Sequence, residues 1–375
     1  MKILFVTRTL SGGGGERQLW TLATGLARRG VSVIIATFYD SASDPPSGAG
    51  VRVVGGGKSG RWDVARFLAS NVALLRRERP DIVHGYLPAA NCLAASLKPF
   101  LPGVKVVFGV RASNVDLGRY DAMSGATYRV ERWLARAADM VICNSEAGRV
   151  HALALGYPAA SLIVIDNGFD AERFRFDAAA RKSVRAEWGV GSEEFLIGAV
   201  GRLDPMKDHA NFLDAFHRVA VQRDKARGVI VGDGPPPLLE ALRERAERLG
   251  VSGRVVWSPA RADVEGVYSA LDALCLSSAY GEGMPNVVGE AMACGTPVAV
   301  TDVGDAARLV DGLGEVVPPR DAAALAAAVI RLMDLDDRAR AERVAAGLRR
   351  IGDEFSVSRM VDRTFAALDG LAPSR

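Results

Sequence analysis

The sequence predicts an α/β protein built from two doubly wound, parallel-sheet domains. A chain of 375 residues is longer than one hydrophobic core usually serves. Short β-branched runs alternate with amphipathic helical stretches from the first residues onward, which is the pattern of a parallel sheet covered by helices on both faces. The alternation begins again after residues 166–180. We therefore expect an N-terminal domain over residues 1–170 and a C-terminal domain over residues 171–354, facing each other across a cleft.

Each domain is expected to contain six strands. In the first domain these are residues 3–7, 31–37, 51–54, 82–84, 104–110 and 140–144. In the second they are residues 195–201, 228–231, 255–257, 273–276, 297–300 and 315–317. The first helix should run from about residue 16 to residue 29 and stop at Gly30, and a last helix near residues 355–372 could pack on either domain. Ligands are expected at the C-terminal ends of the strands.

The charges are unevenly distributed, although the net charge is only +3. Residues 1–165 carry 20 Lys or Arg against 11 Asp or Glu, while the remainder carries 27 against 33. This asymmetry suggests that the first half meets an anionic partner, such as a phosphorylated acceptor or an acidic membrane face. The alternative is a basic surface that only faces solvent. No nucleic-acid partner is expected.

One hypothesis for residues 61–79 is a helix that lies on a membrane surface. Apolar residues alternate there with arginines, a composition compatible with a helix lying in the membrane interface. The apolar residues are Trp62, Phe67, Leu68, Leu74 and Leu75. A helix packed on the core with a basic outer face is the favoured alternative.

Other features favour a cytoplasmic protein without a structural metal. No apolar run approaches the ~20 residues of a spanning helix, and residues 1–7 lead directly into a strand pattern instead of a signal peptide. The four cysteines are Cys92, Cys143, Cys275 and Cys294. Each is isolated within an apolar stretch, which predicts buried, reduced thiols and neither a disulfide nor a zinc site.

A glycine-rich loop, residues 11–16, separates the first strand from the first helix. Its glycines, including Gly13 and Gly14, would let the backbone approach a ligand, and a helix N-terminus suits phosphate. Arg17 stands where a nicotinamide-dinucleotide fingerprint needs glycine, so that cofactor is not expected. A flexible turn is the alternative.

A histidine, His84, falls at the expected C-terminal end of the fourth strand. Such folds place ligand contacts on this rim, so His84 is a candidate sugar-contacting or catalytic group. A lone histidine can equally be a structural residue.

Two cations follow the first strand of the second domain. Arg202 and Lys207 are five residues apart and well arranged to hold a diphosphate by charge-assisted hydrogen bonds. They would neutralise a leaving group as its negative charge grows, in place of a divalent metal. A solvated basic turn is the alternative.

A carboxylate pair lies in residues 282–297. Pro285 suits the first position of a helix, which puts Glu282 in the loop before it and Glu290 on the helix. Backbone N–H groups of Gly283, Met284 and Asn286 could bind sugar hydroxyls or phosphate. The two carboxylates could accept hydroxyl hydrogen bonds from a nucleotide sugar, one from the sugar and one from the ribose. Otherwise both glutamates are helix-start and solvent residues.

Over nearly its whole length the chain resembles family 4 of the retaining glycosyltransferases. The resemblance rests on the joint order of several motifs: Gly13-Gly14-x-Glu16, His84, Asn167-Gly168-Phe169-Asp170 followed by Phe174, Gly201-Arg202-Leu203 followed by Lys207, Gly232-Asp233-Gly234-Pro235, and Glu282 and Glu290 with seven residues between them. It implies the GT-B fold, two facing Rossmann-like domains with the site in the cleft.

The resemblance also implies the roles of individual residues. Arg202 and Lys207 would hold the donor diphosphate, and Glu290 the ribose. Glu282 and the segment Gly283, Met284, Pro285 and Asn286 would hold the transferred sugar. Gly13 and Gly14 would approach its phosphate or the acceptor, and His84 would lie near the reacting carbon. Such enzymes are thought to retain the anomeric configuration by a front-face route, in which the donor phosphate oxygen takes the acceptor proton, so that neither a protein nucleophile nor a metal cofactor is required.

The chain departs from this pattern in one place. Residues 302–308 lack the second glycine and the glutamate that many relatives carry there, which leaves the sugar open. Residues near 256–261 are expected to meet the base. Arg111 and Asn114, after a strand of the first domain, are candidate acceptor contacts.

These observations predict a glycosyltransferase that moves a sugar from a UDP or GDP sugar to an unidentified acceptor in cell-surface or extracellular glycan biosynthesis. Two alternatives stay open. One is a nucleotide-sugar epimerase on the same scaffold, and the other is a nucleotide-binding protein without turnover.

Overall fold

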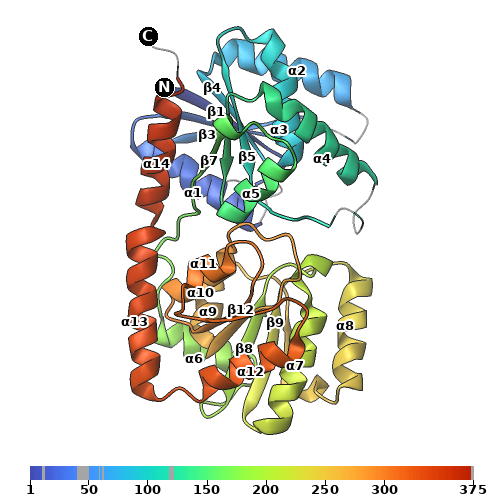
Figure 1. Ribbon diagram of the computed structural model, residues 1–375, viewed down its shortest axis with the longest axis vertical. Helices are drawn as coiled ribbons and strands as arrows, with labels where there is room; N and C mark the ends of the chain where they lie inside the picture. The colour runs from blue at the N-terminus through green and yellow to red at the C-terminus, as the bar shows by residue number, and fades with distance from the viewer. Residues whose placement is uncertain are drawn as a thin grey trace. The chain divides into compact units, whose positions relative to one another are not determined.

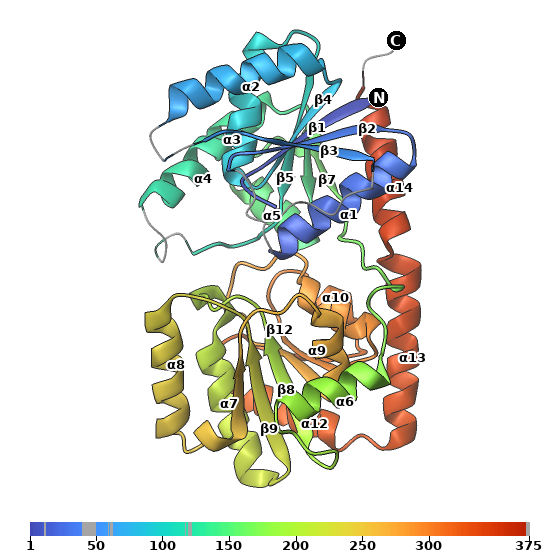
Figure 2. The same cartoon turned by 180° about the vertical axis from the view of Figure 1, so that it is seen from behind.

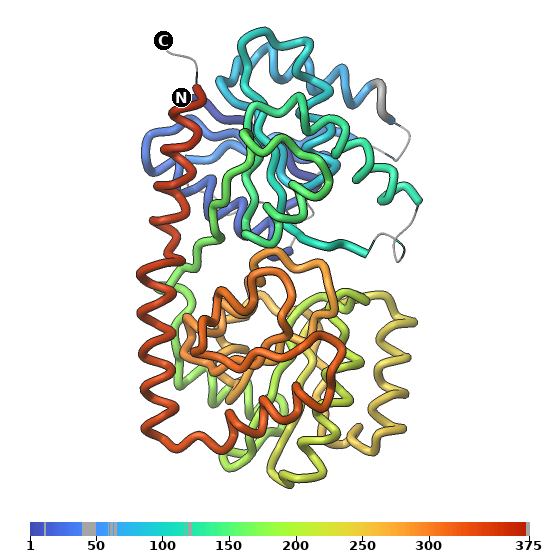
Figure 3. Tube along the Cα trace, viewed as in Figure 1, coloured from blue at the N-terminus to red at the C-terminus, as the bar shows by residue number. Residues whose placement is uncertain are grey.

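The computed structural model describes residues 1–10, 13–39, 50–58, 60, 63–116, 118 and 122–372. The chain divides into two compact units (Figure 1). Unit 1 comprises Met1–Gly168 and Val357–Arg375, and unit 2 comprises Phe169–Ser356. The chain therefore leaves unit 1 once and returns to it for its last helix, which can be followed along the trace in Figure 3.

Unit 1 contains a seven-stranded, all-parallel sheet in the order β3-β2-β1-β4-β5-β6-β7. Apart from the edge strands β3 and β7, its strands are largely apolar runs whose side chains are buried on both faces, as expected of a sheet covered by helices. The strands are β1 Lys2–Thr7, β2 Ser32–Thr37, β3 Val51–Gly55, β4 Ile82–Tyr86, β5 Lys105–Val110, β6 Met140–Cys143 and β7 Leu162–Val164. The strand β7 was not predicted, and β4 extends two residues beyond the predicted end.

Helices cover both faces of this sheet. The helices are α1 Gly14–Arg28, α2 Val64–Glu78, α3 Pro88–Leu97, α4 Ala122–Leu134, α5 Glu146–Ala154 and α14 Val357–Asp369. One face forms a core with α2 and α3, in which Phe67 and Leu75 of α2 are buried. The other face packs against α1 and the C-terminal α14, which lie side by side in Figure 2. Residues 61–79 thus form a core-packed helix as far as they are described, while Arg61 and Trp62 lie outside the described residues.

Unit 2 contains a six-stranded, all-parallel sheet in the order β10-β9-β8-β11-β12-β13. The strands are β8 Phe195–Val200, β9 Ala226–Val231, β10 Val255–Ser258, β11 Ala273–Leu276, β12 Val298–Thr301 and β13 Glu315–Val317. The helices are α6 Ala178–Glu187, α7 His209–Gln222, α8 Pro236–Arg248, α9 Val264–Ala270, α10 Asn286–Ala293, α11 Ala306–Val310, α12 Ala322–Met333 and α13 Asp337–Glu354. All twelve predicted strands are present in the two units.

The cysteines are free thiols, three of them fully buried. Burial raises the pKa of Cys275 to about 12, so this thiol is inert at neutral pH. Within the described residues no helix is both long and apolar enough to cross a membrane. The same residues contain no group of three or more His, Cys, Asp or Glu side chains that could hold a metal ion.

Candidate functional site

A lysine–glutamate pair lies at the C-terminal edge of the sheet of unit 2, where the loops after the neighbouring strands β8 and β11 meet. Lys207 Nζ is 2.6 Å from Glu282 Oε1, and the Ser278 hydroxyl donates to the same oxygen at 2.6 Å. The Ser277 hydroxyl donates to the Lys207 carbonyl at 2.8 Å. Two consecutive serines after β11 therefore fix both members of the pair. These serines were not predicted as site residues, although hydroxyls directly after a strand end were a signal for such a role.

The loop that carries Lys207 is held by its own local hydrogen bonds. Asp204 caps the 3₁₀ turn η5 Pro205–Lys207 by accepting from the Met206 N–H at 2.9 Å. The Ala279 N–H donates to the Met206 carbonyl at 2.8 Å. Gly281 has φ of +81°, and a Cβ there would lie 2.5 Å from Met206 Sδ, so only glycine fits this close approach. The two loops are thereby locked to each other.

Arg202 lies on the same loop but is far more exposed. Its side chain is 70% exposed, and its Nη2 donates to Asp204 at 3.1 Å. The backbone beside it is fixed, because the Leu203 N–H donates to the Asp233 carbonyl at 2.8 Å and a Cβ at Gly232 would collide with the Gly201 carbonyl. Arg202 is therefore an exposed cation on a hydrogen-bonded backbone, while Lys207, 19% exposed, is held by its bond to Glu282.

The second glutamate lies on a helix, as predicted. Glu290 is on α10, is 2% exposed and accepts a hydrogen bond of 2.8 Å from the Tyr268 hydroxyl. Pro285, the predicted first helical residue, is instead the N-cap of α10, which begins one position later at Asn286. Met284 packs in the core with 3% exposure, so only its backbone can meet a ligand.

Residues 302–308, which differ from the family sequence pattern, contact the segment that follows Glu282. The Asp305 N–H donates to the Gly283 carbonyl at 2.8 Å, and the Asp305 carboxylate pairs with Arg308 Nε at 2.7 Å. Gly304, with φ of +63°, packs directly on the backbone of Glu282 and Gly283. This loop therefore supports the segment that follows Glu282.

The predicted position of His84 is wrong. It lies in the middle of β4 and is fully buried, because the strand continues to Tyr86. Burial, followed by the nearby Arg111, lowers the pKa of His84 to about 3, so the ring is neutral at physiological pH. Neither ring nitrogen has a hydrogen-bond partner in the described structure. The predicted role of His84 as a sugar-contacting or catalytic group stays a prediction.

The glycine loop of unit 1 is described from Gly13 onward, and Ser11 and Gly12 lie outside the described residues. Gly13 is the N-cap of α1 and Gly14 its first residue. The Glu16 carboxylate folds back over Gly13, where a Cβ would collide with it. An acidic side chain thus occupies the N-terminus of α1, where the helix dipole favours negative charge. A phosphate at this position would have to displace it.

Both halves of the chain match models of glycosyltransferase families. The model for Glycosyltransferase Family 4 matches residues 12–173, and the model for Glycosyl transferases group 1 matches residues 194–335. A D-inositol 3-phosphate glycosyltransferase of Segniliparus rotundus is 30% identical over 318 residues, which cover 78% of this chain and 70% of the relative. The chain belongs to glycosyltransferase family 4. A glycogen synthase of Mycobacterium tuberculosis is 29% identical over 92% of this glycosyltransferase and 87% of its own length.

Solved structures share the fold of this glycosyltransferase. Anabaena HepE in complex with UDP-glucose has a TM-score of 0.84 at 24% identity, covering 99% of this chain and all of that one. WaaG, a glycosyltransferase involved in lipopolysaccharide biosynthesis, has a TM-score of 0.77 at 19% identity, covering 98% of this chain and all of that one. The predicted GT-B fold, with two Rossmann-like parallel-sheet units, is confirmed.

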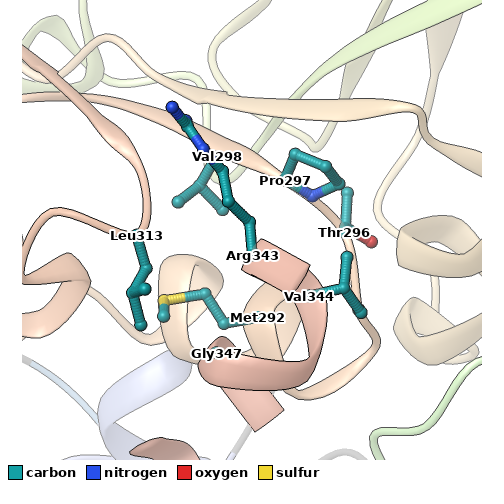
Figure 4. A pocket seen from close by; sticks show the side chains of 9 residues that line it. Met292, Thr296, Pro297, Val298, Leu313, Arg343, Val344 and Gly347 are labelled. Atoms are coloured by element: carbon teal, nitrogen blue, oxygen red, sulfur yellow. The ribbon is translucent and has the colours of Figure 1, made fainter. Parts of the chain in front are cut away.

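A pocket elsewhere in unit 2 of the glycosyltransferase does not belong to this site. It lies beside α13 and β12 (Figure 4), and contains none of the predicted site residues. Its one charged lining side chain, Arg343, pairs with Glu315 at 3.0 Å. The lining is otherwise mostly apolar, so it offers little to a diphosphate.

Proposed function

We propose that this family 4 glycosyltransferase transfers a sugar from a UDP or GDP sugar to an acceptor, with retention and without a metal ion. The observation that carries this proposal is the Lys207–Glu282 pair at the sheet edge of unit 2. An ammonium group has three protons, so Lys207 can keep its bond to Glu282 and still donate to a diphosphate. Arg202, exposed nearby on the same loop, can swing toward the other phosphate. HepE, which was solved with UDP and UDP-glucose, supports testing uridine sugars first.

The proposed reaction needs no protein nucleophile. The bond between the anomeric carbon and the diphosphate oxygen breaks, and a bond to the acceptor oxygen forms on the same face. The acceptor proton passes to the departing phosphate oxygen. Lys207 and Arg202 stabilise the negative charge that grows on the diphosphate, an effect that is strongest where water is excluded. Glu282 and the backbone from Gly283 to Asn286 orient the transferred sugar.

A panel of nucleotide sugars in the presence of a chelator tests this proposal. We expect at least one UDP or GDP sugar to bind by calorimetry, with the nucleoside diphosphate as competitor. NMR of the products separates the alternatives: an epimerase converts the donor sugar without an acceptor, whereas a transferase slowly hydrolyses the donor. A protein that binds the donor and leaves it unchanged would be a nucleotide-binding scaffold. Absence of any diphosphate-sensitive binding would refute the proposal.

Glu290 is proposed to hold the donor ribose, with Tyr268 fixing its carboxylate. We expect Glu290→Gln to weaken binding of the nucleoside diphosphate about tenfold, since a hydrogen bond to a charged group contributes about 1.5 kcal/mol or more. Calorimetry measures this change directly. Glu244→Gln, at an exposed position of α8, is the matched control. An unchanged affinity in Glu290→Gln would remove the ribose role.

The acceptor is proposed to be a glycan, a lipid-linked precursor or a small molecule used in cell-surface or extracellular glycan biosynthesis. The relatives named above carry different acceptor names, so they do not select one. The loop at 302–308 differs from the family pattern, and the residues around 256–261 are proposed to meet the base.

We also infer peripheral contact with the inner face of the cytoplasmic membrane, through α4. This helix exposes three apolar side chains: Trp133 by 71%, Val130 by 48% and Met123 by 42%. Arg129, Arg132 and Arg136 are exposed on or directly after it, with no carboxylate partner in the described part of the chain. Exposed apolar side chains among unpaired cations are typical of a surface that binds anionic lipid.

Trp133→Ser is expected to reduce binding to phosphatidylglycerol vesicles about tenfold at low salt, because a buried aromatic side chain contributes about 1.5 to 3 kcal/mol. Co-sedimentation measures the bound fraction. Val221→Ser, in unit 2, removes an apolar side chain of the same 71% exposure and should change nothing. If the wild-type protein does not sediment with these vesicles, the membrane proposal is wrong.

A further inference from the structure

Three neighbouring strands of unit 1 end in polar side chains on the same face of the sheet. Tyr86 is the last residue of β4, Arg111 follows β5, and Asn144 follows β6. Each lies an even number of residues after a core side chain on the face covered by α1 and α14, namely Ile82, Val107 and Ile142. The three strands are adjacent, and the Asn144 N–H donates to the Val110 carbonyl at 3.0 Å. We refer to Tyr86, Arg111 and Asn144 as the Arg111 cluster.

Arg111 is a cation that has no counterion among the described residues. Its guanidinium carbon is 4.0 Å from the centroid of the Tyr86 ring, so the two groups stack. Its Nε is buried and has no hydrogen-bond partner, and none of the described carboxylates forms an ion pair with it. Buried charged groups are normally paired, because removing an unpaired charge from water is costly. The residue as a whole is only half-buried, so a ligand can reach the far end of the guanidinium.

Two further polar groups of the cluster are unsatisfied. The Tyr86 hydroxyl and Asn144 Oδ1 are buried, with side chains 1% and 4% exposed, and neither has a partner among the described residues. Native proteins rarely leave buried polar atoms unpaired, and such atoms gathered in one place indicate an absent partner. The cluster offers donors from Arg111 and Tyr86 and an acceptor from Asn144. An oxyanion with a neighbouring hydroxyl group satisfies all three.

The surroundings leave Arg111 as the dominant charge. His84 packs against Tyr86, with ring centroids 6.0 Å apart, and is neutral because burial lowers its pKa to about 3. Burial raises the pKa of the Tyr86 phenol, and the negative charge of nearby Glu16 raises it further. Its carboxylate is engaged over Gly13 at the start of α1. Leu87, the next residue after Tyr86, has φ of +86°, a conformation that is strained for leucine.

We propose that the Arg111 cluster binds an oxyanion, a phosphate or a carboxylate, carried by the acceptor. This inference rests on the proposed function, because it assigns the acceptor class to unit 1 of a glycosyltransferase. Arg111 and Tyr86 donate to the oxyanion, and a hydroxyl of the acceptor donates to Asn144. The excess of positive charge in residues 1–165 favours an anionic acceptor in the same sense.

Ligand-observed NMR with inorganic phosphate and with acetate tests the inference on the full chain. We expect at least one of the two to bind, and which one binds better distinguishes a phosphorylated from a carboxylated acceptor. Arg111→Gln should weaken that binding at least tenfold, while Arg28→Gln, at an exposed position in the last turn of α1, should not. Nucleoside diphosphate binding should be the same in all of these proteins, because it belongs to unit 2. Its loss in the wild type would instead count against the proposed function.

A second variant guards against misfolding of Arg111→Gln. Tyr86→Phe keeps the ring that stacks on Arg111 and removes only the unpaired hydroxyl. We expect it to bind the oxyanion several-fold more weakly while its Tm stays the same or rises, since a buried unsatisfied group is removed. A purely structural cluster would show the change in Tm without the change in binding. Failure of both phosphate and acetate to bind the wild type, or unchanged binding in Arg111→Gln, would overturn the inference.

Discussion

Lys207→Met is expected to lower kcat/KM for the nucleotide sugar by about 10²- to 10³-fold, the range found when one donor to a developing oxyanion is removed. Methionine has nearly the length of lysine but no charge, so the buried cation of the proposed donor site is lost while the loop is retained. Arg202 cannot replace it, because its side chain is exposed and anchored at a different position of the same loop. Steady-state release of nucleoside diphosphate measures the effect.

Two further variants separate catalysis from stability. Lys207→Met leaves the Glu282 carboxylate, 8% exposed, without its cation, and breaking a buried ion pair costs about 3 to 5 kcal/mol. Adding Glu282→Gln removes the negative charge that Lys207 balanced, so the double variant should recover the Tm but not the activity. Lys225→Met, at a lysine 70% exposed in the same unit, is the matched control. Activity within a few-fold of wild type in Lys207→Met would exclude the diphosphate role.

Acidification should destabilise unit 1 through His84, and His84→Phe should reduce that loss by about 2 kcal/mol at pH 5. The folded pKa of His84, about 3, lies below the usual value of 6.5, so the unfolded chain binds the proton more readily. Stability therefore rises with pH between about 3 and 6.5, and falls as the pH is lowered through this window. A pH of 5 lies 1.5 units below the usual pKa of 6.5, and each unit costs about 1.4 kcal/mol of stability.

Hydrogen exchange of the β1, β4 and β5 amides at pH 7 and pH 5 measures the stability of unit 1 separately from that of unit 2. Phenylalanine is the matched replacement, because His84 packs between the Phe5 and Tyr86 rings. Burial raises the pKa of Glu131 to about 7, which acts in the opposite sense, stabilising below about 4.5 and losing that effect as the pH rises through 7. This contribution is common to both proteins and cancels in the comparison. Equal pH dependence in wild type and His84→Phe would contradict the assignment.

Most of the fold follows from local patterns in the sequence. Buried parallel strands are continuous β-branched runs, so segments such as β1 and β8 were predicted nearly to their ends. The strand β7 was missed because it has only three residues, too few for a periodic signal. The destination of α14 could not be predicted, since an amphipathic face such as that of Met360, Val361 and Leu368 indicates burial but not the partner. Its partner is α1, where Gly25 leaves room for Val361.

The site was predictable in residue type but not in pairing. The spacing of Arg202 and Lys207, and of Glu282 and Glu290, indicated a diphosphate and two sugars. That Lys207 bonds to Glu282, 75 positions away, depends on β8 and β11 being neighbours, which no local pattern reveals. His84 was misplaced because the fourth strand was ended two residues early, and a shift of this kind changes which residue reaches the rim. Arg111 was predicted only as an acceptor candidate, because the lack of a counterion for it among the described residues is a property of the folded chain.

The way the chain passes between the two units has a consequence for dissecting the enzyme. In unit 1, a Cβ on Gly168 would lie 2.7 Å from Val357 Cα, so the end of one segment touches the start of the next. In unit 2, the Phe169 N–H donates to the Phe355 carbonyl at 2.8 Å, and Phe169 forms a β-bridge with Ser356. In chain order, unit 2 is therefore an insertion within unit 1, and its two ends are hydrogen-bonded to each other. We expect that excising it and joining Gly168 to Val357 by a few residues would leave the backbone of unit 1 undisturbed, so that unit 1 and unit 2 can be studied as separate polypeptides.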